Sequence, residues 1–374
     1  MKLLTFENAA RQSRIGALLS DHASADPHDA DLRIVDLHAA CALYLRDVEG
    51  EVVFDLLADA QVPPDARAHF HFGRLADALI PPDMLALFRG GDTNLSAARK
   101  ALDHVAHLAR NNADVTGPAG ERVLYSRRDI QLKAPIIPKK FFHTAGNFRE
   151  HHEEATKAGF SHPVMPWIVF FQNTDAIIGP DEPVIYPEHL TQELDYELEL
   201  AVVLKKAGKH FTPEAAASYI GGYVIFNDIT ARDIQRREMK SGVFSFCKGI
   251  DTFCPLGPWI VTADEIPDAH NLAMELRVNG EARQRSHSSK MSVKIPEILS
   301  HYSPMGYSAG DVVSTGTVSG VAAFSGDPKA WYLKPGDVME CEIEKIGVLR
   351  NPVISWEKAY GQRPAALATQ ETSK

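Results

Sequence analysis

The sequence has few cysteines, no long apolar run and a shortage of basic residues, and each of these excludes a class of protein. Its 374 residues include 4 cysteines, none in a CxxC pair or beside histidines at zinc-site spacing, so we expect free thiols and no zinc site. No apolar run approaches the ~18 residues that a membrane span requires. Lys+Arg 39 against Asp+Glu 49 gives a net charge of −10. This balance argues against a nucleic-acid partner, because such proteins carry a basic face.

The beginning of the chain also lacks a recognisable targeting signal. Residues 1–16 contain no apolar core of the length that a signal peptide requires. We therefore expect a cytoplasmic protein without a membrane partner. The composition is 45% hydrophobic and 24% charged, which supplies enough apolar side chains for a large core without disulfides or a structural metal.

Two parts of the chain differ in the secondary structure that their sequences predict. Residues 1–134 mix short strand-like segments with helical ones, and the stretch 92–112 has apolar residues at helical spacing. From 135 to 360 the sequence is rich in strand-like runs such as LELAVVL. We predict a smaller mixed α/β accessory domain over 1–134, a β-rich catalytic domain over 135–360, and a flexible tail over 361–374.

Two carboxylates interrupt an otherwise apolar strand. Glu197 and Glu199 occupy alternate positions of the run DYELEL, so a strand directs both side chains to one face. Burying two ionised carboxylates together is costly unless a cation or a shared proton compensates them. An edge strand with a solvated acidic face is the alternative for this motif taken alone.

A third carboxylate ends the next apolar strand. Asp228 closes the run GYVIFND, 29 residues after Glu199. An aspartate that caps the following helix is the simpler interpretation in isolation. Three carboxylates on neighbouring strands, however, suit a hard divalent ion such as Mg²⁺, Mn²⁺ or Ca²⁺.

Polar and cationic side chains follow Asp228. Arg232 and Gln235 lie three positions apart in a predicted helix over 231–239, hence on one face, and Lys248 comes shortly afterwards. Such cations are ordinarily surface residues. Beside a carboxylate metal site they indicate an anionic ligand that bridges the metal and the cations.

Two further motifs are weak individually. His151 and Glu154 lie one helical turn apart and can hydrogen-bond, which would orient the imidazole as a base acting on water; a solvated helix face is the alternative. The run STGTVSG places small residues around Thr317, so that backbone amides and a hydroxyl can approach a ligand carboxylate. A tight turn is the alternative there.

Together these motifs resemble one family, the fumarylacetoacetate hydrolases and their acylpyruvate-hydrolase relatives, over roughly residues 135–355. Six motifs in the same order carry the resemblance: TAGNFREH at 144–151, DYELEL at 195–200, GYVIFNDITARDIQ at 222–235, KGIDTFCPLGPW at 248–259, NGEARQ at 279–284 and STGTVSG at 314–320. The resemblance implies an α+β, β-rich fold, namely a mixed β-sandwich roll, that assembles as a homodimer with a lid around the His–Glu segment.

The resemblance also implies roles for individual residues. It makes Glu197, Glu199 and Asp228 the metal ligands, with Mg²⁺ as the first expectation and Mn²⁺ or Ca²⁺ as alternatives. His151 and Glu154 correspond to the catalytic dyad. The groups expected to hold the substrate or stabilise a developing oxyanion are Arg232, Lys248, Gln235 and Thr317, together with Phe148, which stands where the family has tyrosine.

The implied activity is hydrolysis of a carbon–carbon bond in a 1,3-dicarbonyl acid of the acylpyruvate type, with a small anionic keto acid as the substrate. One alternative uses the same metal-stabilised enolate for decarboxylation, isomerisation, or hydration and dehydration of a 2-keto acid. An alternative of another class is a non-catalytic, metal-dependent keto-acid-binding protein.

Overall fold

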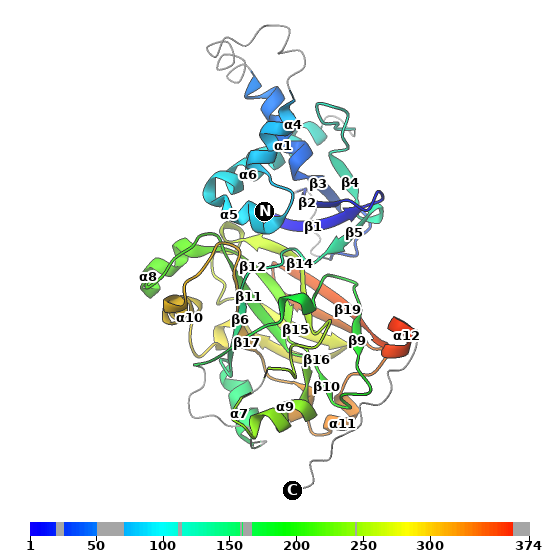
Figure 1. The fold of residues 1–374 in the computed structure, drawn as a ribbon, viewed down its shortest axis with the longest axis vertical. Helices are drawn as coiled ribbons and strands as arrows, with labels where there is room; N and C mark the ends of the chain where they lie inside the picture. The colour runs from blue at the N-terminus through cyan, green and yellow to red at the C-terminus, as the bar shows by residue number, and fades with distance from the viewer. Residues whose placement is uncertain are drawn as a thin grey trace.

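A computed structural model describes residues 1–19, 26–50, 71–110, 114–157, 159, 167–243 and 245–361 (Figure 1). The predicted tail lies outside the described residues except for Gly361. The helices are α1 (Leu37–Asp47), α4 (Phe72–Leu79), α5 (Met84–Arg89), α6 (Gly91–Ala109), α7 (Arg149–Lys157), α8 (Pro213–Ala216), α9 (Arg232–Met239), α10 (Ile295–Tyr302), α11 (Pro328–Trp331) and α12 (Trp356–Tyr360).

Within the described ranges, a 12-stranded mixed sheet forms the frame of the molecule. Its strands are β1 (Lys2–Asn8), β2 (Ser13–Leu18), β3 (Arg33–Asp36), β4 (Leu124–Ser126), β5 (Ile130–Lys133), β6 (Phe141–Ala145), β7 (Ile168–Phe171), β8 (Ile177–Ile178), β11 (Leu198–Leu204), β12 (Ile220–Asn227), β14 (Cys254–Thr262) and β17 (Val312–Thr317). The main path runs β4-β3-β2-β1-β14-β12-β11-β17-β6-β7. Because β1 pairs with β14, the strands before residue 134 continue the sheet of the later part (Figure 1).

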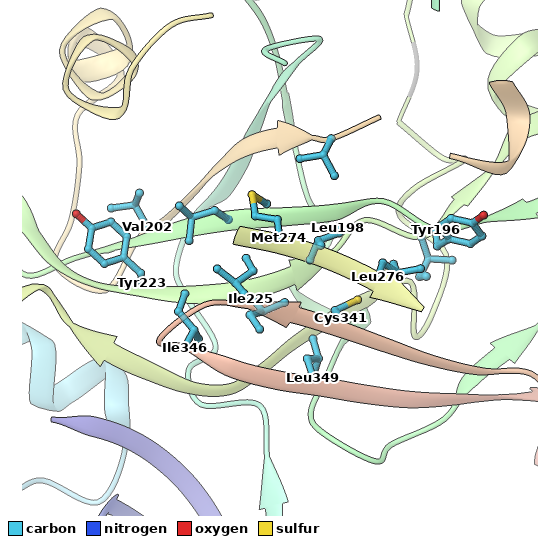
Figure 2. Close-up of a cluster of buried hydrophobic side chains, with 14 of the residues drawn as sticks. Tyr196, Leu198, Val202, Tyr223, Ile225, Met274, Leu276, Cys341, Ile346 and Leu349 are labelled. Atoms are coloured by element: carbon cyan, nitrogen blue, oxygen red, sulfur yellow. The ribbon is translucent and has the colours of Figure 1, made fainter. Parts of the chain in front are cut away.

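A smaller sheet packs on one face of the central strands. Its order is β16-β15-β18-β19-β9, from β9 (Val184–Tyr186), β15 (Ala273–Val278), β16 (Glu281–His287), β18 (Val338–Ile343) and β19 (Gly347–Ser355). Figure 2 shows Leu198, Val202 and Ile225 of the large sheet facing Leu276 and Cys341 of the small one. This apolar layer is the main core, and the strands β10 (Leu194–Asp195) and β13 (Thr230–Ala231) form a separate two-stranded ladder.

Helices from the first third of the chain cover the opposite face of the large sheet. Ala201 and Val203 of β11 belong to a second apolar cluster that also contains Leu43 of α1, Leu87 of α5 and Leu102 of α6. Both faces of β11 are therefore buried, which explains why its sequence is continuously apolar rather than alternating. The β-rich α+β fold predicted from the sequence is confirmed, and the early helices supply one wall of the core.

The expected absence of disulfides is also met in the structure. Cys41, Cys247, Cys254 and Cys341 are all described, buried and unpaired. No helix in the described part of the chain has the length and apolar character needed to cross a membrane.

Candidate active site

One pocket gathers most of the side chains singled out in the sequence. The predicted residues that line it are His151, Glu197, Glu199, Asp228, Arg232, Gln235, Lys248 and Thr317. They come from α7, β11 and the residue just before it, β17, α9, and the segments that follow β12 and α9. Among the described residues, the lining does not include the other two predicted ones, Glu154 and Phe148.

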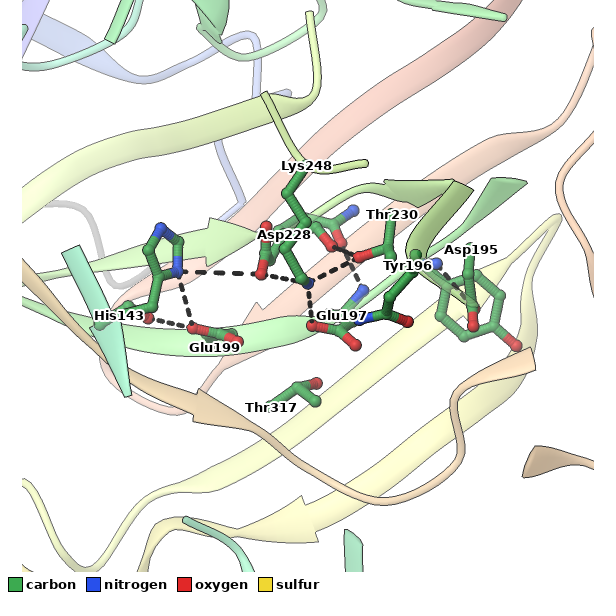
Figure 3. A network of polar contacts seen from close by, with 12 residues as sticks. His143, Asp195, Tyr196, Glu197, Glu199, Asp228, Thr230, Lys248 and Thr317 are labelled. Carbon is green, nitrogen blue, oxygen red and sulfur yellow. Dashed lines mark hydrogen bonds and ion pairs between the residues drawn. The ribbon is translucent and has the colours of Figure 1, made fainter. Parts of the chain in front are cut away.

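The register of three neighbouring strands brings a histidine and a carboxylate together. In the order β11-β17-β6, Ala201 pairs with Ser314, and Ser314 pairs in parallel with His143. Alternation along β11 then puts Glu199 on the same face as Ala201. The Ser314 hydroxyl donates to Glu199 Oε2, and His143 Nδ1 lies 3.7 Å from that oxygen. Asp228 directly follows β12, which pairs with β11 on the side opposite β17 (Figure 3).

The donor atoms of His143, Glu199 and Asp228 form a candidate metal site. One atom from each residue lies within 4.8 Å of the others, and all three side chains are buried. The Oδ1 atom of Asp228 is also buried without a hydrogen-bond partner among the described residues. Two carboxylates and an imidazole can bind a divalent ion, so these residues fit the metal that the sequence predicts.

Glu197 faces two cations instead of this cluster. Its Oε1 accepts from Arg232 Nη2 at 2.6 Å and its Oε2 accepts from Lys248 Nζ at 2.8 Å. Burial alone would raise the pKa of Glu197, but the two cations hold it well below its usual value. Two of the three predicted ligands thus lie in the donor cluster, whereas a metal-binding role for Glu197 stays a prediction.

Lys248 is a buried cation shared by two carboxylates. Besides Glu197, its Nζ donates to Asp228 Oδ2 and, at 2.7 Å, to Thr230 Oγ1 (Figure 3). Burial would lower the pKa of Lys248, but Asp228 and Glu197 raise it above its ordinary value, so the ammonium stays charged. Burial raises the pKa of Asp228, against the opposing effect of Lys248.

Arg232 is fixed by an aspartate that the sequence analysis did not select. Asp195 Oδ2 accepts from Arg232 Nε at 2.7 Å, and its two oxygens also accept from the backbone N–H groups of Ala322 and Ala323. Arg232 Nη1 donates to Gln235 at 2.9 Å, which confirms that the two share a face of α9. Asp195 opens the DYELEL motif, and its position at the start of that acidic run was the available signal.

His151 and Glu154 lie on α7, but they do not form the expected hydrogen bond. The Nδ1 of His151 is buried and has no partner in the described part of the chain, whereas Glu154 Oε2 accepts from the backbone N–H of Gly320 at 3.1 Å. The His151 ring instead contacts Phe324, whose ring centroid is 5.4 Å away. Burial lowers the pKa of His151 to about 4, so the imidazole is neutral at neutral pH.

This pKa predicts a pH-dependent stability. Because the folded-state pKa of His151, about 4, lies below the ordinary value of 6.5, the unfolded chain binds the proton more readily between these values. The stability associated with the neutral ring is complete above pH 6.5 and is lost as the pH falls towards 4. Urea unfolding at several pH values should show this loss, up to about 3 kcal/mol, as a difference from His151→Gln. Parallel pH profiles of the two proteins would contradict it.

The remaining predicted residues have different environments. Phe148 is only 1% exposed and belongs to the main core, so it supports the site from behind without facing the pocket. Thr317 lines the pocket, and its hydroxyl accepts from Gln284 Nε2 at 3.1 Å. Phe170 and Phe324 add apolar lining to the pocket.

Comparisons with known proteins agree with the motifs. Residues 140–354 match the family model described as fumarylacetoacetate (FAA) hydrolase, C-terminal. A rat protein named oxaloacetate tautomerase Fahd2a, mitochondrial, is 35% identical over 266 residues, which cover 71% of this chain and 77% of the relative. Two solved structures, each aligned over 95% of this chain and 99% of their own, are a fumarylacetoacetate hydrolase from Exiguobacterium antarcticum (27% identity, TM-score 0.65) and a 5-carboxymethyl-2-hydroxymuconate delta-isomerase from Mycobacterium smegmatis (26%, TM-score 0.60).

Proposed function

Because the chain belongs to the fumarylacetoacetate hydrolase family, we propose that it is an isomerase that interconverts the keto and enol forms of a small 2-keto acid. Oxaloacetate is the first candidate substrate, since relatives at about a third identity, such as the rat protein, are named oxaloacetate tautomerases. The proposal favours an enolate reaction that the motifs left as an alternative to carbon–carbon bond hydrolysis.

The preference for isomerisation over hydrolysis rests on His151, which is neutral and has no hydrogen bond to Glu154. Hydrolysis needs a base that is oriented to activate water, and Glu154 would supply that orientation, but its carboxylate is bound to Gly320 instead. Isomerisation needs only a neutral base beside the substrate carbon and positive charge beside the enolate oxygen. The pocket contains both, because neutral His151 lines the same enclosure as Lys248 and Arg232.

The proposed reaction is a balanced transfer of one proton. His151 removes a proton from the carbon next to the keto group. The electron pair of that C–H bond forms the carbon–carbon double bond, and the π pair of the carbonyl group moves to its oxygen to give the enolate. The imidazolium then returns the proton to that oxygen, which gives the enol; ketonisation is the reverse. Lys248 and Arg232 place positive charge beside the enolate or the carboxylates of the substrate. A divalent ion held by His143, Glu199 and Asp228 would, when bound, add positive charge at the carbonyl oxygen.

Hydrolysis is the second candidate, favoured by the position of Glu154. This carboxylate is half-buried one helical turn from His151, and burial raises its pKa, although the Gly320 N–H opposes the shift. A rotation of Glu154 towards His151 would create the dyad that activates water. The two candidates therefore differ in a single side-chain contact, and product analysis separates them.

The direct test uses freshly dissolved enol oxaloacetate and follows loss of the enol by ultraviolet absorbance, with Mg²⁺ and Mn²⁺ in parallel. We expect the enzyme to raise the rate above that of buffer, and NMR to find oxaloacetate and its hydrate as the products. Formation of pyruvate and CO₂ would indicate a decarboxylase, and cleavage of acylpyruvates without enol conversion would indicate a hydrolase. Tight binding of oxalate without any turnover would indicate a binding protein.

A further inference from the structure

We propose that Asp195 is a positioning residue, whose carboxylate holds both the guanidinium of Arg232 and the turn that carries Phe324. It thereby sets where the cation that binds the substrate lies relative to His151. Asp195 is not part of the pocket lining, as far as the described residues define it, so it acts through these neighbours. The inference rests on the proposed function for the role of His151, but its part that concerns Arg232 requires only that the pocket binds an anion.

The carboxylate of Asp195 accepts four hydrogen bonds in a site that is 0% exposed. Oδ1 accepts from the backbone N–H groups of Tyr196 and Ala322, both at 2.8 Å (Figure 3). Oδ2 accepts from the N–H of Ala323 at 3.0 Å and from Arg232 Nε at 2.7 Å. An unprotonated carboxylate can accept all four bonds, whereas an asparagine amide has one acceptor oxygen and turns an NH₂ group towards two of the donors. The surroundings therefore suit an aspartate and not its amide.

The bond from Asp195 is one of three that hold the Arg232 guanidinium in place. Its Nε donates to Asp195, Nη1 to Gln235 and Nη2 to Glu197. Because the three acceptors contact three different nitrogens, they fix the plane of the group. Arginine has five N–H groups, so in the described part of the chain one N–H on each Nη atom remains for a ligand of the pocket that Arg232 lines. Two such groups in a fixed plane suit a carboxylate of the substrate.

The same carboxylate holds the turn η7 (Ala322–Phe324), which connects Arg232 with the proposed base. The first two backbone N–H groups of the turn donate to Asp195. Phe324 ends the turn, and its ring centroid lies 5.9 Å from Arg232 Cζ and 5.4 Å from the ring centroid of His151. Since His151 Nδ1 has no hydrogen-bond partner among the described residues, packing against Phe324 orients the imidazole in place of a hydrogen bond at this nitrogen. Asp195 thus links the cation and the base.

The main experiment is a double-mutant cycle of Asp195→Asn and Arg232→Lys in the full-length protein. Calorimetry with oxalate, at a fixed Mg²⁺ concentration, measures the binding of an anion without turnover. We expect Asp195→Asn to bind oxalate at least about tenfold more weakly than the wild type, because a charge-assisted hydrogen bond is lost or misplaced. In the Arg232→Lys protein the same substitution should change the affinity by less than about twofold, because no guanidinium remains for Asp195 to orient.

The kinetics of enol conversion separate the two contacts of Asp195. Asp195→Asn should raise the KM for oxaloacetate at least about tenfold and also lower kcat, because both Arg232 and the turn lose their anchor. Phe324→Leu should lower kcat at least about threefold by releasing the His151 ring. It should leave the oxalate affinity within about twofold of the wild type, since Arg232 keeps its bond to Asp195. A general loss of stability does not produce this division between KM and kcat.

Asp36 provides the matched control, because it is a second buried aspartate that binds an arginine. It is 2% exposed and accepts from Arg14 and from the backbone N–H of Ala39, but it ends β3 and is not among the described residues that line the pocket. Asp36→Asn should lower the midpoint of urea unfolding, as we expect for Asp195→Asn. It should leave the oxalate affinity, KM and kcat within about twofold of the wild type.

Several outcomes would overturn the inference. These are an unchanged oxalate affinity and KM in Asp195→Asn, an equal loss of affinity with Arg232 and with its lysine substitution, or no oxalate binding by the wild type. If Asp195→Asn does not fold, Asp195→Glu replaces it in the cycle. This variant keeps the charge but moves the carboxylate by one methylene, so wild-type affinity there would show that position is unimportant.

The two measurements also separate this inference from the proposed function. A loss of oxalate binding that depends on Arg232, in a protein that does not convert the enol, would contradict only the proposed function. Enol conversion together with an unchanged KM and an unchanged oxalate affinity in Asp195→Asn would contradict only the role of Asp195.

Discussion

Replacement of His151 by glutamine is expected to lower kcat for enol–keto conversion by about 10²- to 10⁴-fold, the usual contribution of a positioned general base. Glutamine keeps the approximate size of the side chain but cannot take up a proton. The KM for oxaloacetate should change little, because the groups placed to hold its carboxylates are Arg232 and Lys248, which the substitution leaves in position. Stopped-flow absorbance with the enol as substrate measures both constants.

The neighbouring His152 provides the matched control. It lies next to His151 on α7 but does not line the pocket, as far as the described residues define it. His152→Gln should therefore retain kcat within about twofold of the wild type. A His151→Gln protein with a kcat as high as that of His152→Gln would remove His151 from the reaction and leave the carboxylates as the candidate bases.

Local sequence patterns were sufficient for the elements that hold the site. The apolar run LELAVVL predicted a strand and forms β11 at Leu198–Leu204, and the spacing over 92–112 predicted the helix that forms α6 at Gly91–Ala109. These signals are reliable because burial on one or both faces imposes a period on neighbouring residues. The motifs likewise identified the family, since each contains a side chain or a turn that the site requires.

Contacts between distant segments could not be predicted in the same way. His143 joins Glu199 and Asp228 only because β6 pairs in parallel with β17, a register that no local pattern encodes. The expected His151–Glu154 hydrogen bond has the correct helical spacing, but the backbone N–H of Gly320 binds the carboxylate from a loop about 170 residues away. Spacing shows which groups can meet, whereas competition among partners decides which of them do.

The contacts of the first third of the chain with the rest of the molecule could not be predicted from local sequence patterns either. Its separate domain over 1–134 stays a prediction, but its β1 extends the large sheet and its helices cover the face that carries Ala201 and Val203. Further along the same face of β11 lies Glu199. The accessory segment thus covers the apolar side chains next to Glu199 on this face, which a reading of chemical motifs alone could not reveal.

Replacement of Lys248 by methionine is expected to destabilise the metal-free protein by about 3–5 kcal/mol, the cost of removing one partner from a buried ion pair. Methionine fills similar space, but Glu197 and Asp228 lose the cation that they share. A divalent ion bound to Asp228 would restore positive charge, so we expect Mn²⁺ to recover part of the lost stability. Urea unfolding in EDTA and in Mn²⁺ measures both effects.

Lys205→Met is the control for this prediction. The Lys205 ammonium pairs with Asp92 at 2.9 Å, but the Asp92 side chain is 83% exposed, so its loss should cost less than about 1 kcal/mol. If Lys248→Met costs as little as Lys205→Met, the buried carboxylates do not depend on the lysine. If it costs much more and Mn²⁺ recovers nothing, the carboxylates need the lysine but do not accept the ion in its place. Recovery by Mn²⁺ in Lys248→Met alone would show that an ammonium and a divalent ion neutralise the same buried charge.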